Sequence, residues 1–396
     1  MFPVIKNISD ILPAIAGKEE FFVCSKNGYS IVNYTCQLES TFENPYELDI
    51  SEQEKLFRLI RRECRGIIFD AVSGDIISRP MSKFFNLGEK HETQHDNIDI
   101  SESHVILAKL DGSFIRPFIS DGKLIYGTKM GETFVTPMVE TFVQDKQQYN
   151  DFNLMLLNKG FTPIYEFLSP LNRIVISYKV ENLVLLAIRS MHTGIYHSYE
   201  DMKNLAAGFD IPVVEALSGS VANMKQFAED TKSLSGIEGF VIRFDSGLQL
   251  KIKADEYIMK HRVKDSIQNE KNLVNLIFSE QMDDVYATLD EQDAEKVKKY
   301  SDHVLEHAMS LSAKLSEIVS NARVEVGEDK KRFACEIVPK HKEYSSLLFT
   351  IWQGKEAFKT IQDYVLSNCQ TQSKIEKMRH ILGDLVWNDV YISQTE

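Results

Sequence analysis

Residues 105–113 read Val-Ile-Leu-Ala-Lys-Leu-Asp-Gly-Ser, an apolar run that ends in a lysine and is followed by an Asp-Gly pair. The apolar run predicts a buried β-strand, and the Asp-Gly pair predicts a turn directly after it. A lysine at such a junction can present its amine at the floor of a cleft, which makes Lys109 a candidate nucleophile. For this short motif taken alone, the alternative is an exposed lysine in a strand-to-turn connection.

Lys109 needs activation to act as a nucleophile, because a free lysine has a pKa of about 10.4. At pH 7 only about one such lysine in 2,500 is neutral, a deficit of about 4.6 kcal/mol. Burial or neighbouring cations would lower the pKa. Lys251-Ile252-Lys253 supplies two cations, because on a strand both lysines share one face while Ile252 faces the core. A solvated strand face is the alternative for this pair.

Two carboxylates lie in apolar surroundings. Glu166 lies between aromatic residues on a predicted strand, and Glu238 directly precedes the apolar strand predicted at 239–244. A carboxylate in such a strand has to pair with a cation or ligate another group. Ribose hydroxyls or Mg²⁺ would meet that need, and a salt bridge to Arg173 or another base is the alternative.

Two further segments place cations beside turns and aromatic residues. Glu63-Cys64-Arg65-Gly66 precedes a predicted strand, and residues 78–86 read Ser-Arg-Pro-Met-Ser-Lys-Phe-Phe-Asn. An arginine offers bidentate contacts to phosphate, and a phenylalanine ring offers a stacking face. Core packing is the alternative for at least one of Phe84 and Phe85.

The composition bounds the class of protein. Of the 396 residues, 43% are hydrophobic and 26% charged, as is ordinary for a globular protein, and no stretch approaches the roughly 18 apolar residues of a membrane span. The net charge of −13 argues against indiscriminate nucleic-acid binding but allows a local basic surface. The five cysteines form no CxxC pair, which disfavours zinc sites and disulfide frameworks. With no recognisable leader, the cytoplasm is the expected compartment.

The pattern of predicted elements changes at about residue 262. Before it, β-branched and aromatic runs predict strands at 21–24, 29–34, 66–70, 105–109, 113–119, 123–127, 163–168, 174–178, 183–189, 239–244 and 248–252, with helices at 136–157 and 199–207. After it, helical spacing links Val304, Ala308, Leu311, Leu315 and Ile318, and further helices are predicted at 271–280, 344–367 and 373–387. We therefore expect an α+β catalytic domain at residues 1–262 and an all-helical domain at 263–396.

In this order and spacing, these segments resemble the covalent nucleotidyltransferase superfamily of ATP-dependent ligases and capping enzymes. More narrowly, the chain resembles the bacteriophage RNA ligase 1 family, which repairs cleaved tRNA. The resemblance covers most of residues 20–260, and its most specific parts are 78–87 and 166–175. It implies an adenylation domain of antiparallel sheets with flanking helices, followed by an all-α domain that selects the RNA.

The resemblance also implies roles for individual residues. Lys109 would be the adenylylated nucleophile, and Gly112 belongs to the same motif. The remaining assignments are Arg65, Lys83, Lys129, Lys251 and Lys253 around the phosphates, Tyr34 and Phe85 lining the nucleotide site, Glu166 at the ribose, and Glu238 and Asp283 at the metal. The implied cofactors are ATP and Mg²⁺ or Mn²⁺.

The implied reaction joins an RNA 5′-phosphate to a 3′-hydroxyl through a lysyl-AMP and an RNA-adenylate. The expected substrates are tRNA halves whose ends a separate kinase and phosphatase have healed, and the expected state is a monomer. Position 110 is Leu where relatives carry Glu, and its side chain is expected to alternate away from Lys109. The basic segment 330–342 would contact tRNA phosphates or be a solvated loop.

Two other readings stay open. The chain could be a non-catalytic RNA clamp that has kept the fold, although a clamp has no need of the nucleophile. It could also be a nucleotidyltransferase of the same superfamily that acts on another acceptor such as DNA. DNA ligases and capping enzymes usually carry an OB-fold after the lysine-pair strand, whereas this chain becomes helical there.

Overall fold

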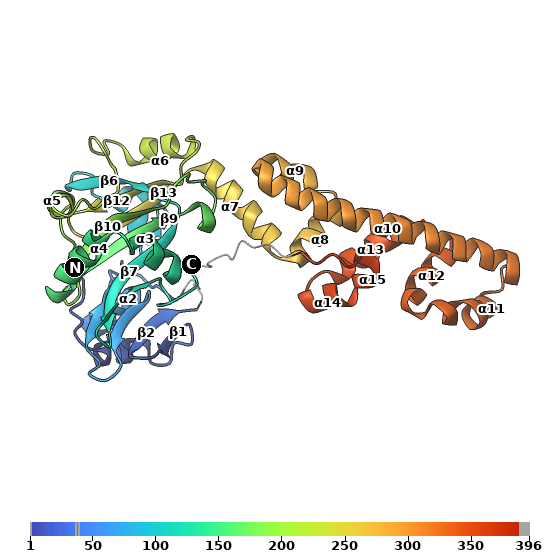
Figure 1. The fold of residues 1–396 in the computed structure, drawn as a ribbon, viewed down its shortest axis with the longest axis horizontal. Coiled ribbons are helices and arrows are strands. Elements are labelled where there is room, and N and C mark those ends of the chain that lie inside the picture. Colours follow the sequence, from blue (N-terminus) through green and yellow to red (C-terminus); the bar gives the residue numbers. More distant parts are fainter. Residues whose placement is uncertain (1, 36–37, 39, 388–396) are drawn as a thin grey trace. The chain divides into compact units, whose positions relative to one another are not determined.

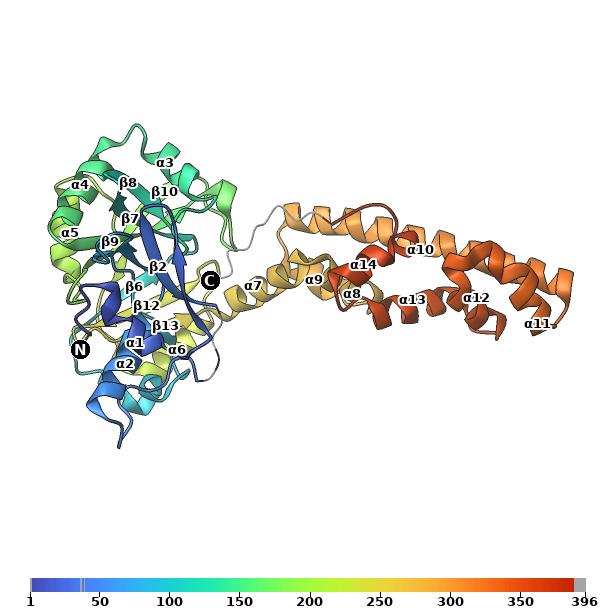
Figure 2. The same ribbon diagram turned by 90° about the horizontal axis from the view of Figure 1, so that it is seen from below.

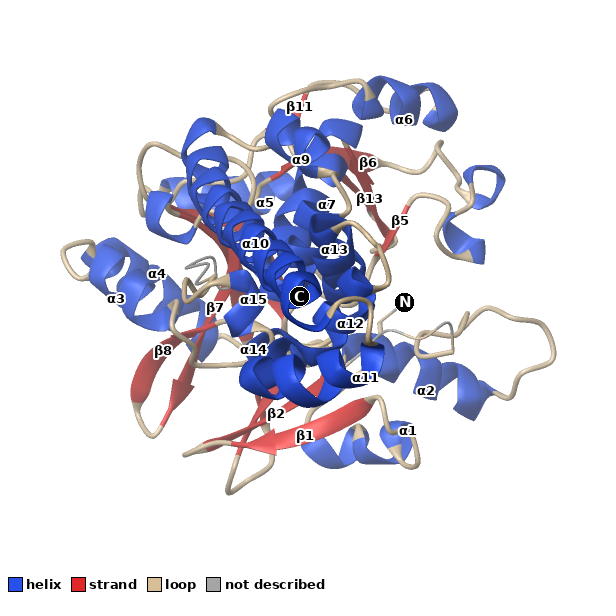
Figure 3. Cartoon of the chain, turned by 90° about the vertical axis from the view of Figure 1, so that its right-hand side faces the viewer, coloured by secondary structure: helices blue, strands red, loops and turns tan. Residues whose placement is uncertain are grey.

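The computed structural model describes residues 2–35, 38 and 40–387. The chain divides between Ile258 and Met259 into two compact units. The first unit combines sheets and helices, whereas the described part of the second contains only helices (Figures 1 and 3).

Three sheets form the first unit. One has the order β1-β2-β3-β4, built from β1 (Phe21–Ser25), β2 (Tyr29–Tyr34), β3 (Ile67–Asp70) and β4 (Ile76–Ser78). The next has the order β10-β9-β7-β8, built from β7 (Ser113–Ser120), β8 (Lys123–Gly127), β9 (Phe161–Leu168) and β10 (Asn182–Ser190). The third has the order β11-β6-β12-β13-β5, built from β5 (Phe85–Asn86), β6 (His104–Lys109), β11 (Ala216–Leu217), β12 (Gly239–Phe244) and β13 (Gln249–Lys253). All these strand pairs are antiparallel except β13 with β5.

Helices flank the sheets of the first unit. They are α1 (Leu12–Ile15), α2 (Glu52–Glu63), α3 (Thr136–Val143), α4 (Gln147–Asn158), α5 (Tyr199–Ala207) and α6 (Met224–Lys232), and α7 (Asp255–Gln268) begins here. α4 packs on β9 and α5 on β10, while α6 covers β12 and β13 (Figure 2). The single helix predicted at 136–157 is therefore two helices, α3 and α4, with a break at 144–146.

A buried ion cluster joins distant parts of the first unit. The Glu63 carboxylate, 1% exposed, accepts from Arg79 Nε at 3.1 Å and from Arg189 Nη1 and Nη2 at 2.8 Å each. Arg79 also donates to the carbonyl oxygens of Pro3 and His192. Glu63 and Arg79, both in segments that the sequence singled out, therefore hold the fold together.

Glu63→Gln is expected to destabilise the first unit by about 3–5 kcal/mol, because it leaves buried arginines without their counter-charge. Burial raises the pKa of Glu63, but Arg189 and Arg79 outweigh it and hold that pKa below its ordinary value. The contribution is therefore fully present above about pH 4.5 and is lost as the pH falls through the lower folded pKa. Hydrogen exchange of the amides in β9 and β10 measures the stability of the first unit separately from that of the second.

The control for this substitution lies on the same helix. Glu52→Gln removes an exposed contact to Lys55 at 3.7 Å and should change stability by less than about 0.5 kcal/mol. Equal protection of β9 and β10 in the Glu63 and Glu52 variants at pH 7 would contradict the role given to Glu63.

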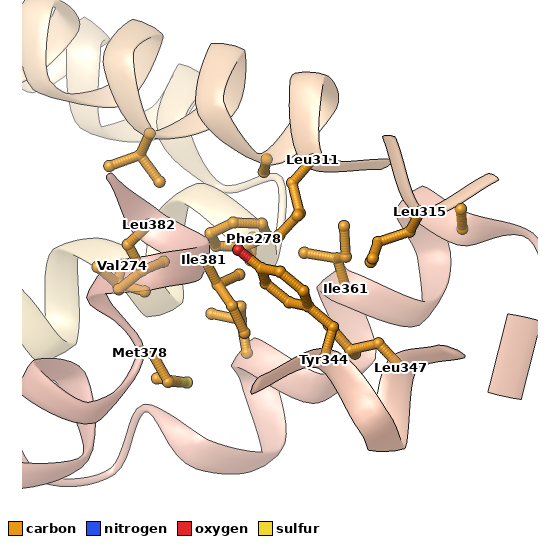
Figure 4. Close-up of a cluster of buried hydrophobic side chains, with 14 of the residues drawn as sticks. Val274, Phe278, Leu311, Leu315, Tyr344, Leu347, Ile361, Met378, Ile381 and Leu382 are labelled. Carbon is orange, nitrogen blue, oxygen red and sulfur yellow. The ribbon is translucent and has the colours of Figure 1, made fainter. Parts of the chain in front are cut away.

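The second unit packs its helices along one long helix. α10 (Glu291–Val326) buries Val304, Ala308, Leu311 and Leu315 as its spacing predicts, although Val319 is more buried than Ile318. The other helices are α8 (Glu270–Phe278), α9 (Met282–Thr288), α11 (Lys330–Arg332), α12 (Ser345–Trp352), α13 (Ala357–Asn368), α14 (Gln372–Lys377) and α15 (Arg379–Leu382). Figure 4 shows Phe278, Leu311, Tyr344 and Ile361 converging in its core.

Two helices predicted in this unit are each divided. The segment 344–367 forms α12 and α13 because Gly354, with φ +93°, ends the first of them in a conformation that glycine adopts readily. The segment 373–387 forms α14 and α15, and the chain leaves helical structure at Gly383. None of the helices among the described residues is long and apolar enough to cross a membrane.

Candidate active site

The third sheet presents Lys109 on one face. Its register places Lys109, Gly239 and Lys253 in one row across β6, β12 and β13. The two following rows are Leu107, Val241 and Lys251, then Val105, Arg243 and Gln249. The residues that alternate with them, Ile106, Ile242, Leu250 and Ile252, pack in an apolar core. Strand alternation therefore places Lys251 and Lys253 on the face opposite the core, as predicted.

Glu238 joins the two lysines of the first row. Its Oε1 atom lies 2.7 Å from Lys109 Nζ and 3.0 Å from Lys253 Nζ, and the carboxylate is almost fully buried. Gly239 allows β12 to pair closely with β13, because a Cβ there would lie 2.0 Å from the Ile252 carbonyl oxygen. A salt bridge was one of the two roles expected for Glu238. The salt bridge is present, and one of its partners is the candidate nucleophile Lys109.

Asp111 anchors the loop that follows β9. Its Oδ2 accepts from the backbone N–H groups of Val175 at 2.8 Å and Ile176 at 2.6 Å, and its Oδ1 accepts from the Tyr257 hydroxyl at 2.7 Å. The strand predicted at 174–178 is therefore wrong, because its N–H groups donate to a side chain instead of to a neighbouring strand. Tyr257 and Asp111 are candidate positioning residues that sequence reasoning missed, since no spacing links α7 to the lysine motif.

The protonation of this anchor reflects its burial. Burial and the nearby Glu238 carboxylate raise the pKa of Asp111, while the N–H groups that donate to it and the Tyr257 hydroxyl oppose the rise. Burial also raises the pKa of Tyr178 to about 12, and its hydroxyl accepts from the Asp111 backbone N–H at 3.1 Å. Tyr178 is therefore neutral at physiological pH and serves as a fixed acceptor.

A cavity of about 80 Å³, here called the lysine cavity, opens beside Lys109. Glu166 lines it and accepts from the Gly112 backbone N–H at 3.0 Å. Gly112 has to lack a side chain, because a Cβ there would lie 2.4 Å from the Phe167 carbonyl oxygen. The other lining residues are Arg65, Met81, Phe84, Leu107, Ala108, Leu110, Phe114, Leu186, Val214, Val241, Arg243 and Gln249.

Leu110 lines the lysine cavity and also packs against a buried apolar core. It follows the last residue of β6, so it lies in the turn after the strand. The expected direction of its side chain, away from Lys109, stays a prediction.

Four of the predicted site residues form a separate cluster. Lys83 Nζ lies 5.6 Å from the ring centroids of both Tyr34 and Phe85, and Lys129 Nζ lies 4.1 Å from that of Tyr34. Phe85 is 2% exposed and packs in the core with Phe42, whereas the half-buried Phe84 lines the lysine cavity. Of these two rings, Phe84 is the one that a ligand in the lysine cavity can touch.

A buried arginine connects the cluster to the lysine cavity. Arg116 on β7 donates to Ser78 Oγ at 3.1 Å, to the Thr128 carbonyl at 2.8 Å and to the Gly66 carbonyl. Burial lowers the pKa of Arg116 to about 9. Its three partners directly adjoin Arg79, Lys129 and Arg65 in the chain. The sequence could have revealed this contact, because Arg116 is a charged residue inside the mostly apolar run 113–120 and a buried charge needs partners.

Asp283 belongs to the second unit, where it is exposed in the first turn of α9. Its assignment to a metal stays a prediction. Among the described residues, no group of three or more His, Cys, Asp or Glu side chains is placed to hold a metal ion.

Two models of known protein families match the sequence of this chain. One, described as RNA ligase, matches residues 63–267, which contain Lys109 and the strands around it. Another, described as T4 RNA ligase 1, C-terminal domain, matches residues 264–377. The chain belongs to the RNA ligase family. The resemblance to the bacteriophage RNA ligase 1 family is thus confirmed.

Two relatives agree with this membership in sequence. A putative RNA ligase of Thermovibrio ammonificans is 30% identical over 79% of this chain and 81% of its own length. The RNA ligase of Rhodothermus phage RM378 is 26% identical over 72% of this chain and 80% of its own. Among solved structures, an archaeal ATP-dependent RNA ligase matches with a TM-score of 0.44 at 14% identity, over 77% of this chain and 79% of that one.

For an RNA ligase built this way, Gly66→Ala is expected to slow joining about 10- to 100-fold, because Arg65 and Lys129 would be displaced. Gly66 has φ +90°, and a Cβ would lie 2.3 Å from the Lys129 carbonyl oxygen. Gly219→Ala is the matched control: its φ is +100°, but nothing lies within 4 Å of its Cβ position. The joining rates of the two variants are compared after normalisation to the amount of folded protein. Equal losses in both would show that displacement of Arg65 and Lys129 is not the cause.

Proposed function

We propose that the protein uses ATP to join an RNA 5′-phosphate to an RNA 3′-hydroxyl, with Lys109 as the nucleophile. The observation that carries the proposal is the row of Lys109, Gly239 and Lys253 with the buried Glu238 between the lysines. Two cations joined by a carboxylate, one of them lining the lysine cavity, suit the transfer of a charged phosphoryl group. A clamp that only bound RNA would have no use for this arrangement.

Three transfers would follow. First, the neutral amine of Lys109 attacks the α-phosphorus of ATP, an N–P bond forms, and pyrophosphate leaves. Second, a 5′-phosphate oxygen of RNA attacks the same phosphorus, and the N–P electron pair returns to the lysine nitrogen. Third, a 3′-hydroxyl attacks the RNA phosphate, loses its proton, and expels AMP. Lys251, Lys253 and Arg65 would neutralise the phosphates, and Glu166 would orient the ribose.

The residues present fit a divalent cation of the Mg²⁺ type. Glu238 supplies a carboxylate beside the reacting lysine, and Mg²⁺ at nucleotide sites is usually held by one or two carboxylates together with phosphate oxygens. A bound cation would supply charge neutralisation at the phosphates. Asp283 lies in the second unit, and its metal role stays a separate prediction.

The preferred substrate is proposed to be a cleaved tRNA whose ends another enzyme has healed. The second unit, matched by the C-terminal domain model, carries five exposed basic residues on segment 330–342, although Arg332 pairs with Glu336 at 2.8 Å. Phosphate contacts need only such a local surface, even on a chain of net charge −13.

Joining assays with matched strands test the proposal. A 5′-phosphorylated oligoribonucleotide should be circularised or joined only when ATP and Mg²⁺ are both present. Annealed tRNA halves should react faster than an unstructured RNA with the same ends. Faster joining of the equivalent DNA would favour the alternative acceptor, and no joining of any strand would favour the clamp.

A further inference from the structure

A second cavity, of about 280 Å³, lies next to the lysine cavity within the first unit. Leu59 and Arg62 of α2 line one side of it, and Asn97 and Leu248 line others. Phe84 and Gln249 line both cavities and so form a shared wall. A molecule in the second cavity would therefore contact the same ring as a nucleotide beside Lys109.

The walls of the second cavity carry polar atoms that the fold itself leaves unsatisfied. Arg62 Nη2 donates to Glu92 Oε1, whereas Arg62 Nε, Glu92 Oε2 and Gln249 Nε2 are buried without a hydrogen-bond partner among the described residues. Gln249 is 95% buried, since its exposed fraction is 5%. Buried donors and acceptors are normally paired, because an unpaired one costs about 1–3 kcal/mol. Guanidinium, carboxylate and amide groups line this single space, and such groups hydrogen-bond the edge of a nucleobase.

Rings and cations complete the chemistry of this cavity. The half-buried Phe84 lines it, and single-stranded RNA is commonly bound by stacking bases on aromatic side chains. Lys83 also lines it, and Lys251 Nζ lies 5.8 Å from the Phe84 ring centroid. Two lysines therefore lie near the shared wall, where they could neutralise the 5′-phosphate of a bound nucleotide.

We propose that the second cavity holds the 5′-terminal nucleotide of the RNA strand that receives AMP, an inference that rests on the proposed function. The first transfer removes pyrophosphate and leaves AMP on Lys109. A 5′-phosphate oxygen then attacks the phosphorus, a P–O bond forms, and the P–N bond breaks with its electron pair returning to Lys109. A nucleoside seated behind Phe84 presents its 5′-phosphate to the lysine row for this attack.

Leu59→Trp tests the proposal by filling the second cavity from α2. Leu56→Trp is the matched control, because Leu56 is an exposed leucine of the same helix that lines neither cavity. Two rates are measured for each protein: AMP attachment to the enzyme, and AMP transfer to a 5′-phosphorylated oligoribonucleotide at varied concentration. Leu59→Phe narrows the same space with a smaller ring, for the case in which the tryptophan disturbs folding.

The expected result is a KM for the 5′-phosphorylated strand raised about tenfold or more in Leu59→Trp, with AMP attachment within twofold of wild type. Leu56→Trp should match wild type in both measurements. An unchanged KM in both Leu59 variants overturns the proposal. So does a KM change confined to the 3′-hydroxyl strand when pre-adenylated RNA is joined. If the wild-type protein acquires no AMP, the proposed function itself fails. That outcome is distinct from an unchanged KM, which rejects only the role of the second cavity.

Discussion

Lys109→Ala is expected to acquire no covalent nucleotide, whereas wild-type protein incubated with ATP and Mg²⁺ gains about 329 Da, the mass of AMP less water. The reason is that the Lys109 amine is the atom that would form the bond, and Glu238 holds that amine at a fixed place beside the lysine cavity. The joining rate from ATP should fall by at least about 10⁴-fold. Intact-protein mass before and after reaction measures the adduct.

Two controls separate loss of the nucleophile from loss of the fold. Lys123→Ala removes an exposed lysine from the next hairpin and should keep the adduct. Lys109→Ala should still seal an RNA that already carries a 5′-adenylate, because that last step needs no lysine nucleophile. An AMP adduct on Lys109→Ala would assign the chemistry to another residue. Failure of wild type to form one, after pyrophosphate removes any bound AMP, would end the ligase proposal at its first step.

Glu238→Gln is expected to slow AMP attachment about 10²- to 10³-fold, the second largest effect. The substitution keeps the shape of the side chain but removes the charge shared by Lys109 Nζ at 2.7 Å and Lys253 Nζ at 3.0 Å. Two ammonium groups would then face each other without the carboxylate that holds them in place. The Mg²⁺ concentration needed for half-maximal attachment should also rise, if Glu238 helps to hold the metal.

The matched control is Glu229→Gln, which removes the carboxylate from an exposed lysine contact of 2.8 Å on α6. It should leave both the rate and the Mg²⁺ requirement unchanged. Hydrogen exchange in β6, β12 and β13 reports whether the Glu238 variant has lost the sheet itself. A large loss of protection there, with an unchanged Mg²⁺ requirement, would make Glu238 a structural residue only.

The local pattern of the sequence predicted most strands correctly because each one carries its own signal. β2, β8 and β12 have the predicted bounds, since each is a short β-branched or aromatic run closed by a turn. The strand predicted at 174–178 failed because its apolar residues look like a strand, while its N–H groups are claimed by Asp111, far away in the chain. Nothing in the residues 174–178 themselves indicates that a distant side chain will accept their N–H groups in place of a neighbouring strand.

In the candidate site, too, local sequence signals were readable and contacts between distant residues were not. The residue types at 109, 166, 238, 251 and 253 were identified from sequence, because charged side chains in apolar strands require partners wherever they lie. Their roles in the reaction stay predictions. The pairing of Glu238 with Lys109 and Lys253, the burial of Phe85 and the exposure of Phe84 to the cavity came only from the fold.

The sequence by itself determined the succession of a strand-rich part and a helical part, the alternation that places the two lysines of β13 on one face, and the resemblance to the family. Each of these depends on residues that are near one another in the chain. Only the tertiary structure decided which strands lie side by side, and so which carboxylate meets the nucleophile and which cavities share a wall. Those contacts form across more than a hundred residues, between Lys109 and Glu238, and burial in one shared core fixes them rather than any local preference.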